Sequence, residues 1–131
     1  MCIFNNLLFI SRTLPKYKYS IFLFSIIGHI FPIWLYFKGG KGVACFFGAN
    51  LFLTPIPTIL AMILWFFTVK ITKLSSLGAL LSIFLLTIYQ LIFIYGNLEK
   101  GIVFIIFLLI FFKHSSNIKR LIKGEENKIN L

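Results

Sequence analysis

The stretch Ser75–Tyr95 contains no charged side chain, and 12 of its residues are Leu, Ile or Phe. A helix of this length matches the hydrocarbon core of a bilayer, which is about 30 Å thick. Across the whole chain of 131 residues, hydrophobic residues make up 60% and charged residues only 12%. Because about a quarter of the residues in a typical soluble domain are charged, this composition excludes a soluble protein. We therefore predict an all-α, polytopic membrane protein.

The formal net charge of +10 comes from short basic clusters between the apolar runs. This is the pattern that the positive-inside rule produces in membrane proteins. A chain buried in lipid offers little surface to nucleic-acid phosphates, so we expect no nucleic-acid partner. The two cysteines, Cys2 and Cys45, are too few for a disulfide framework or a zinc site, and we expect no metal and no cofactor.

Apolar segments of helical length divide the chain, which we treat as one membrane domain over residues 1–131. A membrane-spanning helix needs about 20 residues, so the shorter segments are interpreted as half-helices. The predicted elements are a span over 20–37, half-helices over 43–53 and 58–69, spans over 75–95 and 98–113, and a cytoplasmic tail over 114–131.

Two prolines interrupt the middle segment within the run Thr54-Pro55-Ile56-Pro57 and disfavour helix there. Each half of the segment, about 12 residues, is about 18 Å long as helix. The segment therefore either crosses the membrane as one kinked helix or enters and returns as a re-entrant pair. Charge favours the return, because nine basic residues then share the cytoplasmic side. These nine are Lys38, Lys41, Lys70, Lys73, Lys113, Lys119, Arg120, Lys123 and Lys128.

The run Lys38–Gly42 (KGGKG) has the composition of an anion site. Its glycines allow backbone N–H groups to converge on an anion, and Gly42 opens a helix whose N-terminal dipole favours negative charge. Lys38 and Lys41 add positive charge. The run is not a nucleotide P-loop, because the glycine spacing differs and Val43 stands where a metal-binding Ser or Thr is needed. A flexible basic loop explains these five residues equally well.

Polar residues also occur inside or next to the apolar segments. His29 is costly within an apolar span and indicates function by default. The alternative is a neutral His29 that bonds a carbonyl freed by Pro32. Ser75 and Ser76 begin a helix after a basic loop, so one hydroxyl is expected to cap that helix, with a substrate contact as the alternative.

The polar tail contains a second pair of candidate site residues. His114 and Asn117 are three residues apart and therefore share one helix face. Leu121 continues this face, while Arg120 projects elsewhere. A solvated stop-transfer tail would explain the basic residues, but it gives no reason for His114 or Asn117.

Together these segments are similar to one enzyme family. GHIFPIWLYFKGGKGVACFFG at Gly28–Gly48, SSLGAL at Ser75–Leu80 and HSSNIKRLIKGEENK at His114–Lys128 resemble the bacterial PlsY family of glycerol-3-phosphate acyltransferases. The family pattern is GHxFPxxxxFKGGKGVAT, followed far downstream by HxxNxxRLxxGxExK. The resemblance covers the chain from about Tyr17 onward.

This resemblance implies a multi-pass protein of the bacterial inner membrane, with its active site and C-terminus in the cytoplasm. The reaction it implies moves the acyl group of an acyl phosphate to the 1-hydroxyl of glycerol 3-phosphate. The product is lysophosphatidic acid, for phospholipid synthesis. The implied partners are these two anionic substrates and membrane lipid. Because acyl phosphate is already activated, positioning and charge neutralisation could supply most of the rate.

The resemblance also implies roles for individual residues. Lys41 would neutralise phosphate as a catalytic residue, and His114 and Asn117, also catalytic, would hold glycerol 3-phosphate. The implied substrate- and phosphate-binding residues are Lys38, Gly39, Gly40, Gly42 and Ser76. The implied supporting residues are His29, Arg120 and Glu126, of which the last would fix the tail through an ion pair with a basic neighbour.

The sequence departs from the family pattern in two places. Family members begin with further helices and a loop resembling SxNxGxTNxxR, and nothing in Met1–Tyr19 matches that loop. We therefore expect an N-terminally truncated member with little activity. The second departure is Cys45, which stands where the family usually has Thr. The alternative function is a catalytically inactive membrane remnant of the family. A transporter is a third class, supported only by the broken helix.

Overall fold

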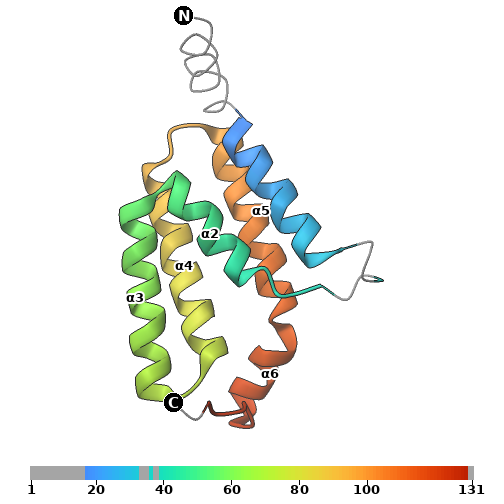
Figure 1. Ribbon diagram of the computed structural model, residues 1–131, viewed down its shortest axis with the longest axis vertical. Helices are drawn as coiled ribbons and strands as arrows, with labels where there is room; N and C mark the ends of the chain where they lie inside the picture. Colours follow the sequence, from blue (N-terminus) through green and yellow to red (C-terminus); the bar gives the residue numbers. More distant parts are fainter. Residues whose placement is uncertain (1–16, 33–35, 37–38, 130–131) are drawn as a thin grey trace, which may run out of the picture.

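The computed structural model describes residues 17–32, 36 and 39–129. A first helix covers residues 17–30. It is followed by α2 (Val43–Leu53), α3 (Pro55–Thr72), α4 (Ser75–Phe93), α5 (Asn97–Lys113) and α6 (Ser115–Lys123). Figure 1 shows the longer helices packed along one another, with α6 turned aside at the lower end. The described residues contain no strand, so the prediction of an all-α fold is confirmed.

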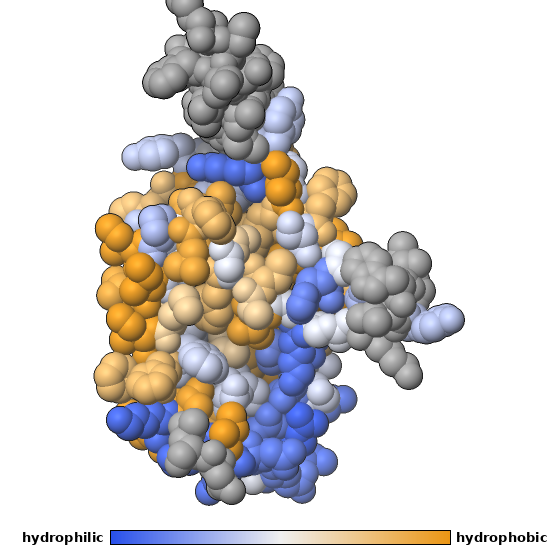
Figure 2. All heavy atoms as spheres, in the orientation of Figure 1, coloured by the Kyte–Doolittle hydropathy of each residue, from blue (hydrophilic) through white to orange (hydrophobic). Residues whose placement is uncertain are grey.

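Two helices, α3 and α4, are long and apolar enough to cross a membrane. α5 and α6 together pass the same test as one broken span, with a bend of 57° between them. Figure 2 shows apolar side chains over the part of the surface formed by α3, and hydrophilic side chains gathered at the lower end near α6. The chain is therefore a multi-pass membrane protein, as predicted.

The first helix is shorter than the span predicted over 20–37. It begins by Tyr17 and ends at residue 30, just before Pro32. The cause of this early end is the proline, which disfavours helical backbone at the residue before it. Residues 33–35 and 37–38, including Lys38 of the glycine-lysine run, lie outside the described residues.

The middle segment forms two helices that run in opposite directions (Figure 1). The chain therefore turns back after α2 and does not continue as one kinked helix, and the longer α3 passes the start of α2 before it ends at Thr72 (Figure 1). The second helix differs from the prediction over 58–69, because it begins at Pro55 and extends to Thr72. Prolines in a first helical turn cost little, since the backbone N–H groups there have no acceptor within the helix.

The turn between α2 and α3 satisfies its own backbone carbonyls. The hydroxyl of Thr58 donates to the carbonyl of Asn50 at 3.0 Å and to the carbonyl of Thr54 at 2.6 Å. The side chain of Asn50 is fully buried; it donates to the carbonyl of Phe46 and accepts a hydrogen bond of 2.6 Å from Gln90 of α4. Polar groups in an apolar setting are costly unless bonded, so these contacts stabilise the turn.

Close packing positions the helices that carry the site. Phe22 of the first helix packs on Phe46 of α2, with ring centroids 5.7 Å apart. α3 approaches α4 at Gly78, where a Cβ would lie 3.0 Å from a methyl group of Val69 and 3.1 Å from the carbonyl of Trp65. A larger residue at position 78 would therefore push the start of α4 away from α3.

Candidate functional site

The glycine-lysine run leads directly into α2. Gly42 is the N-cap of this helix and has a φ of +82°, in the left-handed region that strains residues with a side chain. No side chain caps α2, which leaves its first backbone N–H groups without a capping acceptor. Lys41 precedes this helix end and is exposed. Together, these features attract an anion to the start of α2.

Gly39 and Gly40 lie against the end of the first helix. A Cβ on Gly39 would clash with the carbonyls of His29 and Ile30, and a Cβ on Gly40 would lie 2.6 Å from Nε2 of His29. The lack of side chains therefore allows the loop to approach the helix. The ring of His29 makes no hydrogen bond with any described residue, so the bond considered with a carbonyl freed by Pro32 is not formed.

Glu126 is the centre of a hydrogen-bond network that joins α4, α6 and the tail. Oε1 of its carboxylate accepts hydrogen bonds of 2.6 Å from Ser76 of α4 and from Asn117 of α6. Oε2 accepts from Nε of Arg120 at 2.7 Å in an ion pair. These contacts, the Ser76 bond first among them, lower the pKa of Glu126 from 4.5 to about 2. The carboxylate is therefore ionised throughout the physiological pH range.

The backbone after α6 brings Glu126 back to this network. α6 ends at Gly124, whose φ of +71° is in the left-handed region, and the N–H of Glu125 donates to the carbonyl of Arg120. Farther along, the N–H of Ile129 donates to the carbonyl of Lys73 in the α3–α4 loop at 2.8 Å. The tail is thereby tied to the start of α4 at two points.

These elements enclose a cavity of about 310 Å³ at the end of the bundle where α2 begins. Such a volume is within the range of about 300–1,000 Å³ that is usual for small-molecule sites. Seven of the residues that line it are polar or charged. The residues that line it are Lys41, Val43, Trp65, Ser75, Ser76, Ala79, His114, Asn117, Glu126 and Asn127.

His114 and Asn117 contribute hydrogen-bond acceptors to this cavity. Nδ1 of His114 lies 2.9 Å from the carbonyl of Ile110 and must carry the proton, because a carbonyl can only accept. Nε2 is then the acceptor of the neutral ring. Oδ1 of Asn117 is buried and has no hydrogen-bond partner among the described residues. Both atoms are suited to accept hydrogen bonds from the hydroxyl groups of a ligand.

The structure brings together most of the residues that the sequence singled out. Those that line the cavity are Lys41, Ser76, His114, Asn117 and Glu126. Gly39, Gly40 and His29 lie instead at the neighbouring contact of loop and helix. The expected N-cap at Ser75 or Ser76 is wrong: Leu74 is the N-cap of α4 and no side chain caps it, because the Ser76 hydroxyl bonds Glu126.

Sequence reasoning gave no site role to four of the lining residues, Val43, Trp65, Ala79 and Asn127. Trp65 belongs to an apolar helix and gives no sequence signal that distinguishes it from a lipid-facing residue. Asn127 follows Glu126 in the tail and could have been found only from the path of the chain after Gly124. Trp65 forms the apolar part of the lining together with Val43 and Ala79.

The model of one protein family, described as glycerol-3-phosphate acyltransferase, matches residues 2–124. This range is nearly the whole chain. The chain belongs to the glycerol-3-phosphate acyltransferase family. The match begins at residue 2, whereas the resemblance described from the sequence motifs begins at about Tyr17.

Curated glycerol-3-phosphate acyltransferases are similar along most of this chain. A relative from Ruthia magnifica subsp. Calyptogena magnifica is 43% identical over 110 residues, which are 84% of this chain and 56% of the relative. A relative from Pelagibacter ubique is 36% identical over 124 residues, or 95% of this chain and 64% of the relative. This member of the family therefore spans only part of the length of the relatives that it matches.

Solved structures of an acyltransferase of the same kind share the fold. The crystal structure of PlsY (YgiH), an integral membrane glycerol 3-phosphate acyltransferase, in its glycerol 3-phosphate form has a TM-score of 0.75 and 26% identity to this chain. The likeness covers 81% of this chain and 53% of PlsY. A structure of PlsY in its lysophosphatidic acid form has the same TM-score.

Proposed function

We propose that this chain forms an acyltransferase site that moves a fatty acyl group from acyl phosphate to the 1-hydroxyl of glycerol 3-phosphate. The products are lysophosphatidic acid and inorganic phosphate. The observation that carries the proposal is the cavity of about 310 Å³, where a cationic helix start faces the hydrogen-bond acceptors of His114 and Asn117. Family membership and the ligands named for the PlsY structures support the same reaction.

The two sides of the cavity fit the two ends of glycerol 3-phosphate. Lys41 and the free N–H groups after Gly42 suit its phosphate. Nε2 of His114 and Oδ1 of Asn117 suit its hydroxyl groups. The amide nitrogen of Asn117 donates to the carboxylate of Glu126, so the amide oxygen of Asn117 is directed away from that carboxylate.

Positioning and charge are the means of catalysis that this site offers. The 1-hydroxyl attacks the acyl carbon, the bond from that carbon to the phosphate oxygen breaks, and the proton passes to a phosphate oxygen. Lys41 stabilises negative charge on the departing phosphate. The sequence contains no Asp, and the hydrogen-bond partner of His114 is a carbonyl, so a carboxylate–His pair does not take part.

The proposed location is the bacterial inner membrane, with the cavity and the tail on the cytoplasmic side. The cavity lies at the bundle end where basic residues are concentrated, including Lys41, Lys73 and Arg120. Cytoplasmic loops of membrane proteins carry an excess of Lys and Arg. Water-soluble glycerol 3-phosphate would enter from this side, while the acyl chain of the other substrate would remain in the lipid.

The test is acylation of radiolabelled glycerol 3-phosphate by palmitoyl phosphate, with the purified chain in lipid nanodiscs. The radiolabel allows slow turnover to be measured. Lys41→Ala is expected to lower product formation by about 100-fold or more, as loss of a charge-stabilising group does. Lys70→Ala is the matched control, because Lys70 is an exposed Lys that does not line the cavity. Equal product from the unchanged chain and Lys41→Ala would contradict the proposal.

A further inference from the structure

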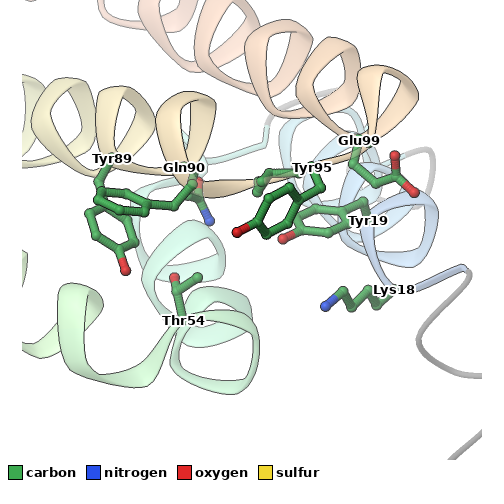
Figure 3. Close-up of a pocket in the computed structure, with 10 residues that line it drawn as sticks. Lys18, Tyr19, Thr54, Tyr89, Gln90, Tyr95 and Glu99 are labelled. Atoms are coloured by element: carbon green, nitrogen blue, oxygen red, sulfur yellow. The ribbon is translucent and has the colours of Figure 1, made fainter.

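A second cavity, of about 340 Å³, lies at the opposite end of the bundle. It is formed where the start of the first helix, the α2–α3 turn and the α4–α5 connection meet (Figure 3). Its charged lining residues are Lys18 and Glu99, and its polar ones include Tyr19, Tyr95, Thr54 and Gln90. None of these residues lines the cavity at the start of α2.

The two charged groups of this cavity are of opposite sign and are not paired with each other. The ion pair found among the described residues joins Arg120 and Glu126 at the other end of the bundle. Lys18 instead lies over the ring of Tyr19, with Nζ 5.2 Å from the ring centroid. Glu99 is in the first turn of α5, where the helix dipole favours a negative charge. The cavity therefore offers one cation and one anion, separately, to a ligand.

The inner wall of the cavity contains an unsatisfied acceptor. Gln90 is fully buried, and its Nε2 donates to Asn50. Its Oε1 has no hydrogen-bond partner among the described residues. In Figure 3 the amide nitrogen of Gln90 is directed toward the space between Tyr95 and Thr54, and the oxygen lies behind it near the ribbon of α4. A buried amide oxygen is costly without a donor, so the inner wall of the cavity is polar but closed at this point.

Donors occupy another part of the cavity. Figure 3 shows the hydroxyls of Tyr19 and Tyr95 pointing into one region, with the ammonium of Lys18 nearby. Phenol hydroxyls and an ammonium group are suited to the oxygens of a phosphate. A ligand that matches both Lys18 and Glu99 carries a phosphate and an ammonium group and has no net charge. A simple anion would be repelled by Glu99, and a simple cation by Lys18.

From these features we propose that this cavity binds the headgroup of a zwitterionic aminophospholipid, of the phosphoethanolamine class. Its phosphate would face Lys18 and the tyrosine hydroxyls, and its ammonium group would face Glu99. The position of the cavity favours a lipid as the source of this headgroup. The cavity lies at the end of α4, a helix long and apolar enough to cross a membrane, and it is lined by three Tyr side chains. Tyr is enriched where membrane proteins meet lipid headgroups.

The experiment is native mass spectrometry of the full chain released from nanodiscs that contain equal parts of phosphatidylethanolamine and phosphatidylglycerol. The unchanged chain is expected to retain one phosphatidylethanolamine in preference to phosphatidylglycerol. Glu99→Gln is expected to lower that retention about tenfold, as loss of one charge-assisted contact does. Glu125→Gln removes the same charge from an exposed tail residue and is expected to leave retention unchanged.

A second pair of variants keeps every charge. The carboxylate of Glu99 lies against Gly96, where a Cβ would clash with it, so Gly96→Ala is expected to move Glu99 and weaken retention. Gly101→Ala is the control, because nothing lies within 4 Å of its added Cβ. Equal retention of the two lipids by the unchanged chain overturns the proposal, as does unchanged retention in both Glu99→Gln and Gly96→Ala.

Soluble phosphorylethanolamine distinguishes a lipid from a free headgroup as the ligand. It is added to the detergent-solubilised chain before measurement of bound phosphatidylethanolamine. A lipid also binds through its acyl chains, which the soluble headgroup lacks. The soluble headgroup should therefore displace little of the bound phosphatidylethanolamine. Complete displacement at equimolar concentration overturns the assignment to a lipid. Neither result depends on acyl transfer, so this proposal can fail or succeed separately from the proposed function.

Discussion

Gln90 of α4 donates a hydrogen bond of 2.6 Å to Asn50 of α2, across 40 positions of sequence. Both side chains are fully buried in a bundle whose neighbouring residues are mostly apolar. The bond connects α4, a membrane-crossing helix, to α2, the helix whose first turn borders the candidate site. The orientation of that site therefore depends in part on an amide pair at the other end of α2.

Gln90→Leu is expected to destabilise the chain by about 1–2 kcal/mol, because it leaves the side-chain oxygen of Asn50 buried without a donor. Thr87→Val is the matched control on the same helix. The hydroxyl of Thr87 is buried without a partner among the described residues, so its removal breaks no bond. Unfolding of both variants in mixed detergent micelles measures the difference. Equal stability of the two would show that the amide pair contributes nothing.

Glu126→Gln is expected to release the tail from α4 and α6. The variant loses the ion pair with Arg120 and weakens the hydrogen bonds from Ser76 and Asn117. Limited proteolysis after Lys123 and Lys128 measures this release, with faster cleavage expected in the variant. Glu125→Gln is the control, because Glu125 is exposed and its side chain forms no ion pair in the described structure. Identical cleavage rates in the two variants would argue against the network.

The contribution of Glu126 to stability should also depend on pH. Its pKa is lowered on folding from 4.5 to about 2, chiefly by the Ser76 hydrogen bond, so folding favours the ionised form. The stabilisation is therefore complete above about pH 4.5, decreases as the pH falls below that value, and is lost near pH 2. The stability difference between the unchanged chain and Glu126→Gln should follow this course. A difference that stays constant from pH 7 to pH 2 would be evidence against it.

The neighbouring serines at the start of α4 should respond differently to substitution. Ser76→Ala removes the hydroxyl that bonds Glu126, whereas the Ser75 side chain makes no hydrogen bond with a described residue. We expect Ser76→Ala to weaken binding of glycerol 3-phosphate by about fivefold to tenfold, equivalent to about 1 kcal/mol. Ser75→Ala should bind nearly as the unchanged chain does. Isothermal titration with glycerol 3-phosphate separates the two.

Topology can be tested by labelling single cysteines with an impermeant thiol reagent in intact cells. Cysteines placed next to Lys73 and Lys119 should be protected from external reagent, and one placed next to Glu99 should react. The first two lie at the bundle end of the candidate site, and Glu99 lies at the opposite end. Native Cys2 and Cys45 are first replaced by Ser. External labelling next to Lys73 would contradict a returning α2–α3 pair.

Length and apolar composition were sufficient to predict the helices, because a long uncharged run has no other stable conformation in lipid. They were not sufficient for the helix ends. The prolines at 55 and 57 do separate two helices, as predicted, but they lie in the first turn of α3, so this helix begins at Pro55 and not at residue 58. Pro32 had the opposite effect and ended the first helix early.

The candidate site was predictable where chemistry is encoded locally. Lys41, His114 and Asn117 occur in short motifs, and the structure brings all three to one cavity. The hydrogen bond between Glu126 and Ser76 could not be predicted from the sequence. The two side chains meet only after α4, α5 and α6 have folded against each other. The pairing of Asn50 with Gln90 gave no sequence signal, since each is a single polar residue within an apolar helix.

The tie between Ser76 and Glu126 also sets an order for biosynthesis. A ribosome makes Ser76 50 residues before its partner, which corresponds to a delay of about 3–10 seconds. During that interval α4 and α5 must both enter the bilayer, in opposite directions, before the carboxylate can reach α4. A chain with one of these helices left outside would hold Ser76 and Glu126 on different sides of the membrane. The hydrogen bond between Ser76 and Glu126 can therefore form only in a chain in which both helices have been inserted.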